Sequence, residues 1–204
     1  MLQKADLTRE KILEVAETLV FDQGFAGTSL SEIVRAAGVT KGAFFHHFDS
    51  KDALGRALVE RYARNDFGIL NAIAERAGAL ADDPLQEALL NLKLFEEWLE
   101  GLEAPLAGCM YASFTHQREL FDAETHRFIA DSLQDWAAIY ERAFERVIAE
   151  RPPRVEGVTA KALAEFQLSV IEGGILLSRA LEDRDLLVRQ CRQLRTYIGL
   201  LFAN

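Results

Sequence analysis

The chain of 204 residues has only two cysteines, only four prolines and no long apolar run. Few cysteines argue against a disulfide-rich protein, and the lack of a long apolar run argues against a membrane protein. The only two cysteines, Cys109 and Cys191, match no metal-ligand spacing, so we predict free thiols in a reducing compartment. No stretch approaches the ~20 apolar residues that cross a bilayer, and the first residues lack the apolar core of a secretory signal. We therefore expect a cytoplasmic protein with no membrane contact.

Positive charge is also scarce, because the formal net charge is -9 at pH 7. Such a balance argues at first sight against a nucleic-acid partner, since neutralisation of phosphates is the usual source of affinity. The charge is unevenly distributed, however. Residues 1–64 hold nine Lys or Arg against nine Asp or Glu, so the remainder carries all of the excess negative charge. A neutral amino-terminal part on an acidic body is compatible with local DNA binding.

Signatures of catalysis are missing as well. The sequence contains no Glu-x-x-His pair, no His-Glu-x-x-His, no phosphate-loop pattern and no Gly-x-Ser-x-Gly. The adjacent His46 and His47 diverge by ~100° on a helix and have no evident third partner, which argues against a metal site. We predict a protein that is not an enzyme and holds no cofactor and no metal. An all-α enzyme and a ligand carrier that does not act on DNA remain the alternatives.

Apolar residues recur at intervals of three and four along nearly the whole chain, and no alternating strand pattern is present. We predict an all-α fold of about nine helices. The first should end at Gly24, and the fourth should link an amino-terminal domain to the rest. The helices are expected to begin at cap residues, prolines or their neighbours, namely Thr8, Ser29, Thr40, Ser50, Pro84, Pro105, Ala123, Thr159 and Asp185.

Residues 29–48 contain two short predicted helices joined by the turn Gly38-Val39-Thr40, as in a helix-turn-helix. Ser29 and Glu32 have the spacing of a capping box at the start of the first helix. In the second helix, Phe44 and Phe48 lie four residues apart and should anchor its inner face. The outer face is then left with small, basic and polar residues.

The segment TSLSEIVRAAGVTKGAFFHHFDSKDAL resembles the DNA-binding signature of the TetR/AcrR regulators. GCMYASF, IEGGILLSRALED and the last leucine-rich helix resemble one branch of that family's ligand-binding domain. The resemblance implies a homodimer that binds a partly palindromic, double-stranded operator and represses transcription until a small molecule binds. It also implies a DNA-binding domain at residues 6–66, with its helix-turn-helix at 29–48, and a ligand-binding and dimerisation domain at residues 67–204.

The resemblance further implies which residues contact DNA. Phosphate contacts would come from the start of the first helix of the motif and from positions after the second, whereas bases would be read from the start of the second helix. Phe45 stands where the family usually has tyrosine, so an expected hydroxyl contact to phosphate is missing. The implied contact residues are Thr28, Ser29, Thr40, Lys41, Gly42, Ala43, Phe45, His46 and Lys51.

The larger domain offers candidates for two further roles. Aromatic side chains of the middle helices could wall a small-molecule site, although filling a core is the alternative for each, and Cys109 is either a small buried residue or a sensing thiol. These ligand candidates are Phe95, Trp98, Cys109, Tyr111, Phe114, His116, Trp136 and Tyr140. Apolar stripes on the last two helices predict a dimer interface, with intramolecular core as the alternative, at Leu163, Phe166, Val170, Gly173, Gly174, Leu177, Leu187, Leu194, Ile198 and Leu201.

Overall fold

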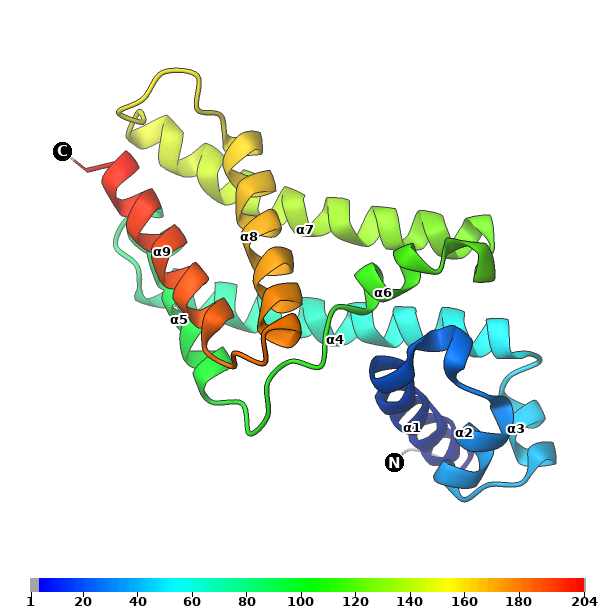
Figure 1. The fold of residues 1–204 in the computed structure, drawn as a ribbon. Helices are drawn as coiled ribbons and strands as arrows, with labels where there is room; N and C mark the ends of the chain where they lie inside the picture. Colours follow the sequence, from blue (N-terminus) through cyan, green and yellow to red (C-terminus); the bar gives the residue numbers. More distant parts are fainter. Residues whose placement is uncertain (1–3, 204) are drawn as a thin grey trace. The chain divides into compact units, whose positions relative to one another are not determined.

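The computed structural model describes residues 4–203, with the side chains of residues 4, 5 and 118 left undescribed. Asn204, the last residue of the predicted second domain, lies outside this range. Over the described residues the chain forms nine α-helices, one short 3-10 helix and no strand, which confirms the predicted fold class (Figure 1). None of these helices is both long and apolar enough to cross a membrane.

The described chain divides into two compact units. The head unit comprises the residues up to Asn65 together with Ala107–Ala130, and the body unit comprises Asp66–Leu106 together with Asp131–Asn204. The predicted boundary after residue 66 lies one residue from the division at Asn65. The segment 107–130, by contrast, was expected in the second domain and groups with the head unit instead.

The head unit begins with helices α1 (Lys4–Gly27), α2 (Leu30–Ala37) and α3 (Lys41–His47) (Figure 1). The first part of α4 (Lys51–Leu80), α6 (Met110–His116), the 3-10 helix η1 (Arg118–Leu120) and the first turns of α7 (Ala123–Glu150) complete it. A common core explains why these short helices hold together, since isolated helices of seven or eight residues are unstable in water. Among its fully buried side chains are Ile12, Phe25, Ile33, Phe44, Leu54 and Phe114.

An aromatic cluster explains why the segment 107–130 belongs to the head unit. The ring of Phe25 lies 5.5 Å from that of Phe114 and 4.8 Å from that of Phe121, and the last two rings stack at 4.1 Å. The Ala26 N–H also donates to the side-chain oxygen of Gln117 at 3.0 Å. Phe25 would lose two aromatic neighbours without this later segment, so the head unit is discontinuous in sequence.

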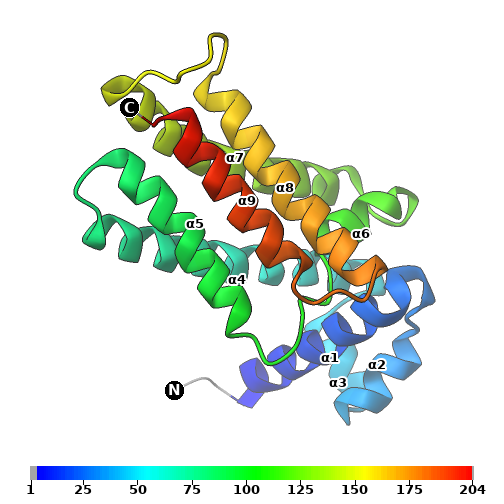
Figure 2. The ribbon, with the colours of Figure 1, turned by 60° about the vertical axis from the view of Figure 1, so that its left-hand side comes forward.

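The body unit contains the second part of α4, helix α5 (Pro84–Glu100), the rest of α7, and helices α8 (Ala160–Ala180) and α9 (Leu186–Leu201). Helix α9 packs along both α5 and α8, as both views show (Figures 1 and 2). A charge is buried between α5 and α9, where the fully buried Glu96 accepts from Arg195 Nε at 2.8 Å. Because a buried carboxylate without a cation is very unfavourable, this pair fixes how α5 and α9 meet.

Local capping signals predicted most helix starts correctly. The side chains of Ser29, Thr40 and Thr159 each accept a hydrogen bond from a backbone N–H of the first helical turn. Two predictions were wrong. Helix α1 (Lys4–Gly27) begins before the predicted cap at Thr8, although it is broken at Gly24, where φ is 76° and where we expected it to end. Pro105 begins no helix, because the chain stays irregular until Met110.

Candidate functional site

Helix α2 and the turn after it are fixed by side-chain and backbone hydrogen bonds. Ser29 Oγ accepts from Glu32 N at 3.2 Å, and the Ser29 N–H donates to Glu32 Oε2 at 2.8 Å, which completes the predicted capping box. The second bond holds the pKa of Glu32 below its usual value. At the other end Gly38 adopts the left-handed conformation, with φ 64°, and its N–H donates to backbone carbonyls of α2. A glycine suits this position, because a Cβ disfavours positive φ.

Helix α3 begins at the end of that turn and has one buried and one open side. Thr40 Oγ1 accepts from Ala43 N at 3.1 Å, so the helix start is capped as predicted. Phe44 and Phe48 are buried, with ring centroids 5.5 Å apart, and they anchor the helix to the head core. Its open side carries the exposed residues Lys41, Gly42, Phe45 and His46, beside the half-buried Ala43.

Phe45 is the unusual residue of this open side. Its ring is 44% exposed and packs edge-on against Phe44, with centroids 5.4 Å apart. A large apolar ring exposed on a capped helix gains little from its own fold. Phe45 is therefore available to an external partner, and it lacks the hydroxyl through which a tyrosine could donate a hydrogen bond.

Two of the residues that we predicted to contact DNA have their polar groups occupied inside the head unit. Thr28 is fully buried, and its hydroxyl donates to the Gly24 carbonyl at 2.8 Å. Lys51 Nζ donates to the Phe25 carbonyl at 2.6 Å and lies over the Phe25 ring, 4.5 Å from its centroid. Burial lowers the pKa of Lys51. Both residues stabilise the head internally, and a contact of either with DNA stays a prediction.

The eight predicted ligand residues are divided between the two units. Cys109, Tyr111, Phe114 and His116 belong to the head unit, whereas Phe95, Trp98, Trp136 and Tyr140 belong to the body unit. Most are buried in the core of their own unit, as the alternative interpretation held for aromatic side chains. Phe114, for example, stacks on Phe121.

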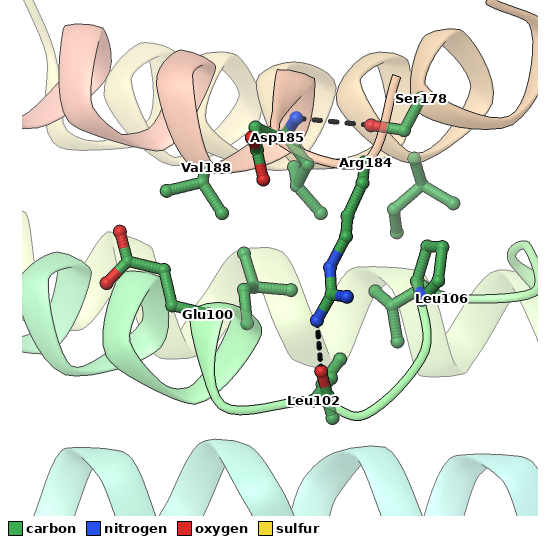
Figure 3. Close-up of a pocket in the computed structure, with 11 residues that line it drawn as sticks. Glu100, Leu102, Leu106, Ser178, Arg184, Asp185 and Val188 are labelled. Atoms are coloured by element: carbon green, nitrogen blue, oxygen red, sulfur yellow. Dashed lines mark hydrogen bonds between the residues drawn. The ribbon is translucent and has the colours of Figure 1, made fainter. Parts of the chain in front are cut away.

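A pocket of about 340 Å³ lies elsewhere, wholly within the body unit (Figure 3). The end of α5, the loop after it, the end of α8 and the start of α9 form its walls. The sequence does not indicate this pocket, because its side chains are mostly aliphatic and come from segments up to 89 positions apart, Leu99 to Val188. No local motif marks such a site. The lining residues are Leu99, Glu100, Leu102, Pro105, Leu106, Ile175, Ser178, Arg184, Asp185, Leu187 and Val188.

Two buried groups of the body unit could be taken for reactive residues. Burial raises the pKa of the Cys191 thiol to about 12, and burial likewise raises the pKa of the Tyr140 hydroxyl. Both groups are therefore neutral at pH 7. A neutral thiol is a poor nucleophile, so the structure gives Cys191 a packing role.

The predicted dimer residues divide into two sets. Phe166 and Leu177 of α8 are exposed, and Val170 and Gly173 are half-buried. The others are already buried within their own chain; Leu187, for instance, packs directly on Gly174. This internally buried set is Leu163, Gly174, Leu187, Leu194, Ile198 and Leu201.

Exposed apolar side chains gather on α8, its carboxyl end and α9. Phe166 of α8 and Tyr197 of α9 pack edge-on, with centroids 5.7 Å apart, and both remain 45% exposed. Exposed apolar side chains that gather on two packed helices in this way indicate a contact with another molecule. We call this surface the α8–α9 face; its large exposed side chains are Phe166, Leu176, Leu177, Leu181, Tyr197 and Leu200.

Parts of the chain are similar to known proteins. The family described as "Bacterial regulatory proteins, tetR family" matches residues 12–58. Over 55 residues the chain is 47% identical to the HTH-type transcriptional repressor NemR of Escherichia coli K12, covering 27% of this chain and 28% of NemR. It is 28% identical over 174 residues to the HTH-type transcriptional regulator LmrA of Bacillus subtilis, covering 84% of this chain and 86% of LmrA.

The fold is also shared with solved structures. A TetR-family transcriptional regulator from Agrobacterium tumefaciens matches with a TM-score of 0.79 at 22% identity, covering 95% of this chain and 98% of that one. The match extends well beyond the helix-turn-helix. The all-α body unit is therefore part of the shared architecture.

Proposed function

We propose that this chain is a transcriptional regulator of the TetR family, which binds a partly palindromic operator as a homodimer and represses transcription until a small molecule binds its body unit. The open side of α3 is the observation that carries the proposal. It presents Lys41, Gly42 and Ala43 at the start of a capped helix, and short side chains there allow close approach to base edges. The relative described as a repressor supports that sense of regulation. Such a protein would act in the cytoplasm.

The DNA fragments that flank its own gene provide the first test of operator binding. We expect a mobility shift at low salt that survives competition by unrelated DNA. Lys41→Gln should weaken this shift at least about five-fold, because a good base contact contributes about 1–3 kcal/mol of discrimination. Lys161→Gln removes the same charge from an exposed position of α8 in the body unit and should leave the shift unchanged.

Failure to shift any flanking fragment, by a protein with an intact helical circular dichroism spectrum, would overturn this proposal. Equal weakening by both substitutions would assign the effect to overall charge, against a role for α3. The all-α carrier that does not act on DNA would then be the better interpretation.

Dimerisation through the α8–α9 face is supported by its exposed apolar area. A two-fold interface uses the same patch on both chains, and two such helices from each chain would form a four-helix contact. Phe166→Glu should convert the dimer to a monomer in sedimentation velocity and abolish operator binding. Leu80→Glu changes another exposed apolar residue, at the end of α4, and should leave the dimer intact. A dimer that persists in Phe166→Glu would rule out this face.

A further inference from the structure

The pocket of the body unit contains an arginine, Arg184, that forms no ion pair with the described residues. The Arg184 side chain crosses the pocket and donates to the Leu102 carbonyl on its far side (Figure 3). A guanidinium carries five N–H donors, so this bond leaves most of them for another acceptor. In the part of the chain that the structure describes, no carboxylate oxygen pairs with Arg184.

Three neighbouring arginines form ion pairs, unlike Arg184. On α9, Arg189 pairs with Asp183 at 2.5 Å, Arg192 with Glu100 at 3.1 Å and Arg195 with Glu96 at 2.8 Å. Each of these cations is matched within the chain. Arg184 differs because its only hydrogen-bond partner among the described residues is a neutral carbonyl.

The side chains around Arg184 are suited to the aliphatic part of a small ligand. Apolar side chains supply most of the pocket wall, including Leu99, Ile175 and Val188. Ser178 Oγ accepts from Leu187 N at 3.1 Å and keeps its own hydrogen for donation. Small-molecule pockets have volumes of about 300–1,000 Å³ and combine apolar walls with a few polar anchors. The volume of this pocket is at the lower end of that range.

We propose that this pocket binds a small aliphatic monocarboxylate, with its carboxylate on the Arg184 guanidinium and its chain among the aliphatic wall residues. An arginine fork binds a carboxylate through two parallel hydrogen bonds, which an alcohol cannot match. The inference rests on the proposed function only in treating this ligand as the effector. The pocket contains none of the aromatic residues that the sequence analysis selected.

Two acidic residues line the pocket, and their charges affect whether it prefers an anionic or a cationic ligand. Glu100 is paired with Arg192, and in Figure 3 its carboxylate lies at the edge, away from Arg184. Asp185, by contrast, makes no side-chain capping bond at the start of α9; its charge interacts with that of Arg189 and would still repel a bound anion. Removal of this charge should strengthen binding of a carboxylate and weaken binding of an amine.

Isothermal titration calorimetry of the full-length protein tests the proposal with three probes that share an eight-carbon chain: octanoate, 1-octanol and octylamine. Octanoate should bind at least ten-fold more tightly than octanol. Arg184→Gln should weaken octanoate at least ten-fold and change octanol less than two-fold, whereas Asp185→Asn should tighten octanoate two- to five-fold. Arg142→Gln, an exposed arginine of α7 in the body unit, should change neither probe.

Leu106→Trp tests whether the probes bind inside the pocket, independently of the charge of Arg184. Leu106 is half-buried, so a larger side chain can fill the pocket without entering the core, and both octanoate and octanol should then bind at least five-fold more weakly. Absence of octanoate binding, equal affinity for octanoate and octanol, tighter binding of octylamine, or octanoate binding that is unchanged in Arg184→Gln would each overturn the proposal.

Operator binding is measured separately. Octanoate should weaken operator binding by the wild-type protein in the mobility-shift assay. The same concentration of octanoate should leave operator binding by Arg184→Gln unchanged. A chain that binds octanoate but never shifts operator DNA would overturn the proposed function and leave the pocket assignment intact. A chain that shifts DNA but binds no octanoate would overturn the pocket assignment alone.

Discussion

At the scale of single residues, Phe45 is the position where this chain departs most clearly from what its family resemblance implies. The exposed ring on α3 offers apolar contact but no hydroxyl. We expect Phe45→Tyr to tighten operator binding by about ten-fold at fixed salt, because a hydrogen bond to a charged group contributes about 1.5–3 kcal/mol. Fluorescence anisotropy with a labelled operator measures this change.

Phe45→Leu is the matched control for the added hydroxyl, because it keeps an apolar side chain and adds no donor. Its operator affinity should stay at or below that of wild type. Unchanged or weaker binding by Phe45→Tyr would mean that the ring edge does not face a phosphate.

Cys191 gives a second prediction at this scale. The thiol is fully buried, and its pKa is raised to about 12, so it stays neutral at pH 8. We expect Cys191 to resist iodoacetamide at pH 8 in the native protein and to react within minutes in denaturant, as read by peptide mass spectrometry. Rapid native labelling of Cys191 would show that α9 opens readily.

At the scale of helices, Gly55 of α4 is a point of close packing in the head unit. A Cβ built on it would lie 2.8 Å from Phe25 and 2.9 Å from Phe121. Gly55→Ala should therefore lower the free energy of unfolding by about 1–3 kcal/mol, the usual cost of overpacking. Urea denaturation followed by circular dichroism checks this value.

The same helix supplies the control. Nothing lies within 4 Å of a Cβ built on Gly68, so Gly68→Ala should raise the free energy of unfolding by about 0.5–1 kcal/mol through helix propensity alone. Equal stabilisation by both alanines would show that the aromatic cluster shifts to accept the extra carbon.

These helices also show what the sequence could predict and what it could not. Capping at Ser29, Thr40 and Thr159 depends on residues three positions away, so reading the local pattern was sufficient. Thr28 and Lys51 resemble surface residues in sequence, yet their hydrogen bonds to Gly24 and Phe25 depend on how the chain folds back. Most of the predicted ligand residues are buried, and their role stays a prediction, since an aromatic residue that fills a core and one that lines a site look identical in sequence.

At the scale of the whole molecule, the distribution of charge sets how strongly DNA binding should depend on salt. All of the excess negative charge lies outside residues 1–64, and the open side of α3 carries a single lysine, Lys41. Each neutralised phosphate contributes about 0.9 to the slope of log K against log salt. We expect a slope smaller in magnitude than about 5 for the dimer, from anisotropy titrations between 50 and 200 mM salt.

A slope near -10 would contradict this expectation, because it would require about ten or more phosphate contacts. Unrelated DNA serves as the control. Its binding should be weak at every salt concentration, since the acidic remainder of the chain repels a polyanion.

The cluster of Phe25, Phe114 and Phe121 also determines where this protein can be cut and recombined. A fragment ending at Asn65 would expose Phe25 and should aggregate. Exchange of DNA specificity with a relative by transplanting the first 65 residues should likewise fail, because the donor's residue 25 would meet foreign aromatic partners. A graft that carries residues 107–130 along with the amino-terminal segment should stay soluble, so functional crossovers between such genes require two exchanged segments.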